Sequence, residues 1–145
     1  MIYLDTSVLA PFYWAEALSD EVECLFRNEV ELAISQLVEV ELFSALSRRV
    51  RMGEIEREEA LLVVERFQTD LEDGFYRRIM LEPAYYTTAR DWISQFATPL
   101  RTFDALHLAI AAATGMPLIT ADKSLSGSGE ALGIKVQLLR SVGDA

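Results

Sequence analysis

Four carboxylates stand where a chain of alternating strands and helices usually keeps its active site. Asp5 follows the apolar run at residues 2–4, and Asp122 follows residues 118–120, where each run predicts a short buried strand. Ligands of open parallel sheets bind outside the carboxyl ends of the strands, so these two side chains should share one edge. Taken singly, either aspartate could instead be a helix cap or a turn residue.

Two more carboxylates lie on predicted helices. Glu41 has Leu37 and Val38 at i−4 and i−3, so it lies in an apolar stripe and needs either a compensating partner or a route to solvent. Asp104 lies in the first turn of its helix, a position that the helix dipole also favours. His107 lies on the same face and could orient Asp104 or a substrate phosphate, although a single histidine on an apolar helix is more often a hydrogen-bonded core residue.

If the fold brings these four carboxylates together, they repel one another and require a cation. A ligand set of oxygen atoms without cysteine favours a hard ion, so Mg²⁺ or Mn²⁺ is the expected cofactor. Such an ion lowers the pKa of a bound water and offsets charge on phosphoryl oxygens. The chemistry that this arrangement suits is therefore hydrolysis of a phosphodiester bond.

Predicted strands alternate with predicted helices along the chain. The alternation favours an α/β fold, a parallel sheet with helices on both faces, in a single domain that spans residues 1–145. A short helix should lie between residues 118–120 and the last strand. The serine- and glycine-rich residues 124–129 are the only loose segment and predict a loop, either at the surface or beside the site. The expected strands cover residues 2–4, 31–34, 75–81, 118–120 and 135–138.

The composition indicates a folded, acidic protein. Hydrophobic residues make up 51% of the chain, which argues against disorder, and the formal net charge is −10. That charge argues against a general nucleic-acid binder, although less strongly if four of the acids bind metal. The single cysteine, Cys24, excludes an internal disulfide and fits a reducing compartment, the cytoplasm. We expect no secretory leader and no membrane span.

Four sequence blocks resemble those of PIN-domain ribonucleases, specifically VapC-type toxins of type II toxin–antitoxin pairs. The second block, residues 35–42 (SQLVEVEL), selects Glu41 over Glu39. Any one block is a weak signal, but the four occur in the family's order across nearly the whole chain. The other three blocks are residues 2–7 (IYLDTS), 101–109 (RTFDALHLA) and 118–122 (LITAD).

The resemblance implies a PIN-like three-layer α/β/α sandwich whose five-stranded parallel sheet has the order 3-2-1-4-5. It also implies an endoribonuclease that uses Mg²⁺ or Mn²⁺, with Asp5 and Asp104 as the principal metal ligands. Glu41 and Asp122 would complete the acidic pocket. The residues that would orient the carboxylates or the substrate are Thr6, Ser7 and Thr120.

The resemblance further implies three partners: an RNA substrate, a second copy in a homodimer, and a VapB-type antitoxin that holds the protein inactive. The contiguous residues 11–14 (PFYW) are a candidate contact for a protein partner, because they cannot all face one core. Ordinary packing of these side chains is the alternative.

Two other functions stay open on the sequence alone. An aspartyl-nucleophile phosphatase also carries Asp followed by Thr after a strand, but it needs a second aspartate two residues on, where this chain has Ser7. A catalytically silent PIN-like module would bind protein or RNA without cutting. All four carboxylates are present, so the sequence shows no sign of such a loss.

Overall fold

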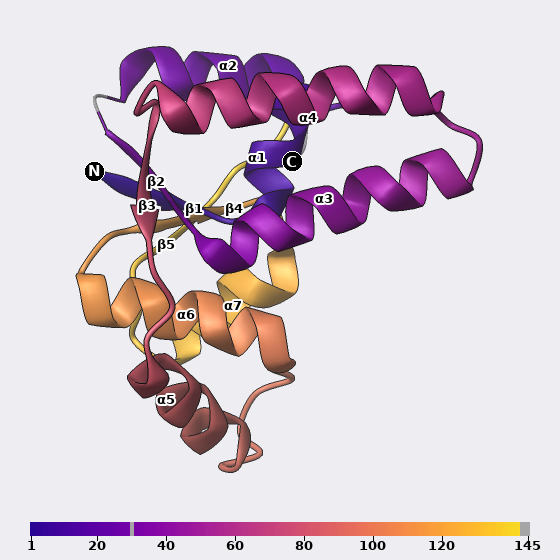
Figure 1. The fold of residues 1–145 in the computed structure, drawn as a ribbon. Coiled ribbons are helices and arrows are strands. Elements are labelled where there is room, and N and C mark those ends of the chain that lie inside the picture. The colour runs from indigo at the N-terminus through magenta and orange to yellow at the C-terminus, as the bar shows by residue number, and fades with distance from the viewer. Residues whose placement is uncertain (30, 143–145) are drawn as a thin grey trace.

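Five strands form one parallel sheet in the computed structural model, which describes residues 1–29 and 31–142. Their order, β3-β2-β1-β4-β5, confirms the expected sheet (Figure 1). The central strands are buried throughout, whereas β3 at one edge exposes Arg77 and Arg78. The strands are β1 (Ile2–Leu4), β2 (Leu32–Ser35), β3 (Tyr76–Ile79), β4 (Leu118–Thr120) and β5 (Val136–Leu138).

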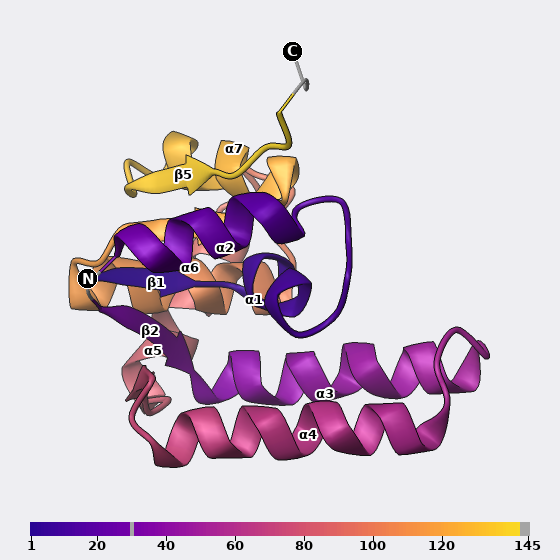
Figure 2. The ribbon, with the colours of Figure 1, turned by 90° about the horizontal axis from the view of Figure 1, so that it is seen from above.

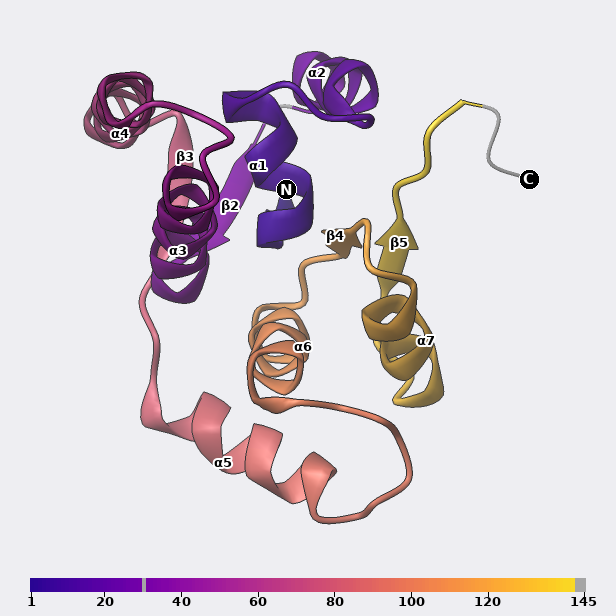
Figure 3. The ribbon, with the colours of Figure 1, turned by 90° about the vertical axis from the view of Figure 1, so that its right-hand side faces the viewer.

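Seven helices of the described residues cover the two faces of the sheet and complete the three expected layers. Helices α1 to α4 lie on one face and α5 to α7 on the other (Figures 1 and 3). Helices α3 and α4 form a long hairpin that extends beyond the sheet (Figure 2). The helices are α1 (Thr6–Tyr13), α2 (Ser19–Asn28), α3 (Gln36–Arg51), α4 (Arg57–Glu72), α5 (Pro83–Ile93), α6 (Thr102–Thr114) and α7 (Lys123–Ala131). None of them is long and apolar enough to cross a membrane.

The strand order reverses between β1 and β4. β1 pairs with β2 on one side and with β4 on the other, where Leu4 lies opposite Ile119. The chain builds β1, β2 and β3 outward in one direction and then crosses to the other side of β1 for β4 and β5. Residues that follow β1 and β4 therefore meet at the point of reversal, where parallel α/β sheets bind their ligands.

Helix α7 is the short helix expected after β4, but it contains residues 124–129, which the sequence predicted as a loop, so the loop prediction was wrong. The helix begins because the Asp122 side chain accepts hydrogen bonds of 2.8 and 3.1 Å from two backbone N–H groups of the first turn. Gly129 allows α7 to approach β5 closely, since a Cβ atom there would overlap the side chain of Val136. Tertiary packing thus outweighs the low helix propensity of the segment.

The aromatic residues 11–14 pack largely within the layer formed by α1 to α4. The ring centroids of Phe12 and Phe26 lie 4.7 Å apart, which joins α1 to α2. The Tyr13 hydroxyl donates to Asp70 at 2.6 Å, which joins α1 to α4. Ordinary packing therefore accounts for most of this run, and its contact with a protein partner stays a prediction.

Candidate active site

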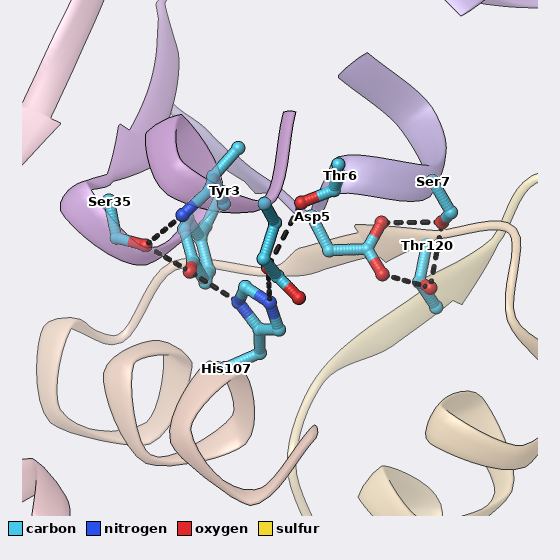
Figure 4. A network of polar contacts seen from close by, with 9 residues as sticks. Tyr3, Asp5, Thr6, Ser7, Ser35, His107 and Thr120 are labelled. Carbon is cyan, nitrogen blue, oxygen red and sulfur yellow. Dashed lines mark hydrogen bonds and ion pairs between the residues drawn. The ribbon is translucent and has the colours of Figure 1, made fainter. Parts of the chain in front are cut away.

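Asp5 is a buried carboxylate held between two hydroxyl groups (Figure 4). The residue is 5% exposed and follows β1 directly. Ser7 Oγ donates to Asp5 Oδ1 at 2.6 Å, and Thr120 Oγ1 donates to Oδ2 at 2.7 Å. The second bond joins residues 115 positions apart in the sequence and crosses from β1 to β4. Both carboxylate oxygens are therefore fixed at the reversal point of the sheet.

The two hydroxyls that hold Asp5 are themselves oriented by the backbone after β4. The N–H of Ala121 donates to Ser7 Oγ at 2.9 Å, and the N–H of Asp122 donates to Thr120 Oγ1 at 3.0 Å. Each hydroxyl accepts one hydrogen bond from the backbone and gives its own proton to the carboxylate. Rotation of Asp5 would break both bonds, so the carboxylate is preorganised.

Glu41, on α3, is held by two other elements. Thr6 Oγ1 at the start of α1 donates to Glu41 Oε1 at 3.0 Å, and His107 Nε2 on α6 lies 2.6 Å from the same oxygen. The Glu41 side chain is 25% exposed, so this carboxylate in an apolar stripe has both a partner and a route to solvent. Within the described residues, the hydrogen bonds of His107 go to Glu41 and Tyr3 and not to Asp104.

A buried hydrogen-bond chain lies behind His107 (Figure 4). His107 Nδ1 lies 2.7 Å from the Tyr3 hydroxyl, which lies 2.8 Å from Ser35 Oγ. Ser35 caps α3 and accepts from the N–H of Val38. One set of directions satisfies every group: Ser35 donates to Tyr3, Tyr3 donates to Nδ1, and Nε2–H donates to Glu41. In the neutral form of the ring, these directions place the proton of His107 on Nε2.

Tyr3 was missed as a site residue when the sequence alone was considered. A signal was present, because a buried tyrosine hydroxyl needs a hydrogen-bond partner, and Tyr3 lies two residues before Asp5 on the same side of the strand. Burial raises the pKa of Tyr3 far above its usual range. The hydroxyl therefore keeps its proton and remains a donor to His107.

Asp104 and Asp122 border the same edge of the sheet from α6 and from the turn after β4. Asp104 lines a cavity of about 490 Å³ together with Glu41 and residues 101–103. Asp122, which we expected beside Asp5, turns its carboxylate toward the N-terminus of α7, and Thr120 makes the contact with Asp5 in its place.

The acidic groups affect one another's protonation. Burial is the main cause that raises the pKa of Asp5, and the charge of Glu41 adds to it. Burial also raises the pKa of Asp104, to which the charges of Asp122 and Glu41 add. His107, when its ring is protonated on both nitrogens, opposes both shifts. The four carboxylates therefore form a single electrostatic cluster.

This cluster is not a preassembled metal cage. Within residues 1–29 and 31–142, no three acidic, histidine or cysteine side chains are arranged to hold a metal ion. Asp5 is bonded to hydroxyls, Glu41 to His107, and Asp122 to the start of α7. The site is an acidic pocket of oxygen donors, some of which would have to turn to share one cation.

Comparison with known protein families gives a match to the PIN domain over residues 2–127. The chain belongs to the PIN domain family. The matched span contains all four carboxylates of the cluster, and the strand order agrees with the one that the PIN resemblance implied. A search of curated proteins gave no match.

Solved structures share this PIN fold at low sequence identity. FitAcB from Neisseria gonorrhoeae has a TM-score of 0.75 at 15% identity, over 94% of this chain and 96% of that one. VapC20 from Mycobacterium tuberculosis, described as a toxin that cleaves the sarcin–ricin loop, has a TM-score of 0.71 at 18% identity, over 89% and 95%. A toxin–antitoxin complex from Klebsiella pneumoniae gives 0.68 at 16%, over 98% and 100%. At these identities the likeness shows the fold.

The donor chemistry of this PIN domain fits a hard divalent cation. The cluster offers carboxylate oxygens, which Mg²⁺ and Mn²⁺ prefer, and the one histidine nearby already bonds to Glu41. A bound cation would also relieve the repulsion that Asp122 and Glu41 exert on Asp104.

Proposed function

We propose that this PIN domain is a metal-dependent endoribonuclease that hydrolyses RNA phosphodiester bonds and is the toxin of a toxin–antitoxin pair. The observation that carries the proposal is the clamped, buried carboxylate of Asp5 at the ligand-binding edge of the sheet, within a cluster of four acids. Burying a carboxylate near others costs stability unless a cation compensates, so this geometry suits a metal ligand better than a structural role.

In this proposal Asp5 and Asp104 are the principal ligands of Mg²⁺ or Mn²⁺, and Glu41 and Asp122 complete the acidic pocket. The ion, when bound, lowers the pKa of a coordinated water and offsets charge on the phosphoryl oxygens. The PIN domain family generally depends on divalent metals, which agrees with the oxygen donors of this site.

The hydroxyl residues of the site act on the carboxylates. Ser7 and Thr120 hold both oxygens of Asp5, and Thr6 holds Glu41 from α1 while His107 holds it from α6. These contacts fix where negative charge lies before any substrate arrives, which is the preorganisation that a nuclease site requires.

The proposed partners follow from the solved relatives. The Klebsiella pneumoniae structure is described as a toxin–antitoxin complex, which supports a VapB-type antitoxin as the regulator of this chain. We also propose that the protein acts as a homodimer on RNA in the cytoplasm. The cleavage reported for VapC20 supports RNA as the substrate class.

The test is an incubation of the purified chain with a mixed pool of structured RNAs, in Mg²⁺ or Mn²⁺ and in EDTA, with Asp5→Asn alongside. We expect cutting that requires the metal and is lost in the variant, while thermal melting shows that the variant is folded. RNA that stays intact with every metal, in a folded chain free of partner, would contradict the proposal.

Helix α3 supplies a matched control for this experiment. Glu39 lies two residues from Glu41 but forms an ion pair with Arg78, in which Arg78 Nη2 donates to Glu39 Oε1 at 2.8 Å. The side chain of Glu39 is 17% exposed. Glu41→Gln should abolish metal-dependent cutting, whereas Glu39→Gln should retain it. Equal losses in both variants would show that any charge change on α3 disturbs the assay.

A second function, binding without cutting, is favoured by one observation, namely that the described residues contain no preassembled metal cage. Antitoxin or RNA binding that ignores Asp5→Asn, together with intact RNA, would establish it. The phosphatase alternative loses support, because Ser7 stands where its second aspartate should be and is committed to holding Asp5.

A further inference from the structure

Exposed aromatic side chains gather beside the acidic cavity. Among the described residues four aromatic side chains are exposed, and three of them lie on α5, on the segment after it and at the start of α6: Tyr86 (52%), Phe96 (89%) and Phe103 (54%). Phe96 also has a φ of 54°, a left-handed backbone conformation that is uncommon for a residue other than glycine. Exposure and backbone strain at one residue point to a function for this segment.

The aromatic surface is continuous with the proposed catalytic acids. Phe103 and Thr102 line the 490 Å³ cavity that also contains Glu41 and Asp104. Thr102 in turn borders a groove of about 450 Å³ between α5 and α6, which is lined by Tyr86 and Phe96. A ligand that passes from the acids along this surface therefore meets aromatic rings in both hollows.

Two unpaired arginines flank the same surface. Arg101 lines the acidic cavity and Arg90 lines the groove. Both are exposed, and within the described residues neither forms an ion pair. On a chain of net charge −10, this pairing of cations with exposed rings selects an anionic ligand that also has flat apolar faces.

We propose that Phe103 and Arg101 form a subsite for an unpaired nucleotide of single-stranded RNA, which rests on the proposed endoribonuclease function. The ring of Phe103 stacks on a base, and the guanidinium of Arg101 contacts a phosphate next to the acids. The groove with Phe96 and Arg90 receives the following nucleotides. Bases of a duplex are stacked on each other, so only an unpaired segment offers them to such rings.

The charge pattern favours RNA over an apolar protein partner. A protein that covered Tyr86, Phe96 and Phe103 would gain from their burial but would leave two arginine side chains to be desolvated or paired. RNA engages both kinds of side chain at once, because each nucleotide carries a base and a phosphate.

The test measures binding of a fluorescein-labelled oligoadenylate of about ten nucleotides by anisotropy, with Mg²⁺, in the Asp5→Asn chain so that RNA stays whole. Phe103→Ala should weaken the Kd by about fivefold or more, and Phe103→Trp should restore it. Leu62→Ala, at a similarly exposed apolar residue of α4, is the control and should leave the Kd unchanged. Arg101→Gln should reduce the dependence of log Kd on log salt by about 0.7.

Three results would overturn this inference. One is a folded Phe103→Ala variant that binds RNA as tightly as its Asp5→Asn parent, and that also leaves KM unchanged when it is made in the chain that retains Asp5. Another is a Phe103→Ala chain that loses self-association in sedimentation while RNA binding persists, which would make the surface a protein interface. The third is a parent chain that neither binds nor cuts RNA, which removes the proposed function as well, whereas the first two leave that function standing.

Discussion

The substitution Tyr3→Phe tests the hydrogen-bond chain behind Glu41 with the smallest possible change. The ring and its packing in β1 stay, and only the hydroxyl between His107 and Ser35 is lost. Both partners are buried, at 3% and 0% exposure. Leaving His107 Nδ1 without a donor costs about 1–3 kcal/mol. Ser35 loses the acceptor of its hydroxyl proton, although it keeps the bond from the N–H of Val38, and adds to that cost.

The expected loss in free energy of unfolding is therefore about 2–4 kcal/mol, or roughly 6–13 °C in Tm for a chain of this length. Urea denaturation with an unchanged m-value measures it. Tyr85→Phe is the matched control, because Tyr85 is 7% exposed and its hydroxyl bonds to none of the described residues. That variant should differ from the parent by less than about 0.5 kcal/mol.

A spectroscopic readout separates the assigned hydrogen-bond directions from general packing. His107 is the only histidine of the chain, so the imidazole ¹⁵N spectrum of the untagged protein reports this one ring. In the neutral ring of the parent the proton should lie on Nε2, and Tyr3→Phe should shift the Nδ1 signal or mix the tautomers. A parent ring that carries its proton on Nδ1 alone would refute the assigned directions. Equal losses in free energy of unfolding for Tyr3→Phe and Tyr85→Phe would refute the role of the hydroxyl.

Three further variants test other parts of the structure. Gly129→Ala should lower the free energy of unfolding by about 1–3 kcal/mol, because the new Cβ overlaps Val136, and adding Val136→Ala should recover part of the loss in urea denaturation. Asp122→Ser keeps a good helix cap but removes the charge. The free energy of unfolding should therefore change by less than about 1 kcal/mol, while metal-dependent RNA cutting is lost. A loss of stability that parallels the loss of cutting would contradict the assigned roles. Asp104→Asn should raise the Tm of the EDTA-treated protein at pH 7, because the raised pKa makes the native carboxylate unfavourable. The gain in Tm over the parent should shrink as pH falls through the raised pKa of Asp104 and vanish below the ordinary value of 3.8. A gain in Tm that grows on acidification would contradict this prediction.

The central strands were the easiest elements to predict. Residues 2–4 and 118–120 lie in strands buried on both faces, which leaves them apolar without alternation and so visible in the sequence. Their order in the sheet came from the family resemblance, because hydrophobic periodicity carries no information about which strands are neighbours. The cap at Ser35 was predictable since it depends on residues within one turn.

The contacts within the site were harder to predict because they join distant segments. His107 bonds to Glu41 across 66 positions and to Tyr3 across 104, distances over which no local pattern relates two residues. The prediction of a loop at residues 124–129, which form part of helix α7, was wrong for a related reason. Gly129 is needed because α7 packs closely against Val136 of β5. Helix propensity alone takes a glycine as a sign of a loop.

The bond between Asp5 and Thr120 has a consequence for biosynthesis. Asp5 is synthesised 115 positions before its partner Thr120. A nascent or stalled chain that lacks β4 carries Asp5 without Thr120 and without the backbone N–H of Ala121, which orients Ser7. For the proposed ribonuclease, activity is thereby postponed until β4 has been synthesised and has joined the sheet, so that a chain shorter than this carries no working site.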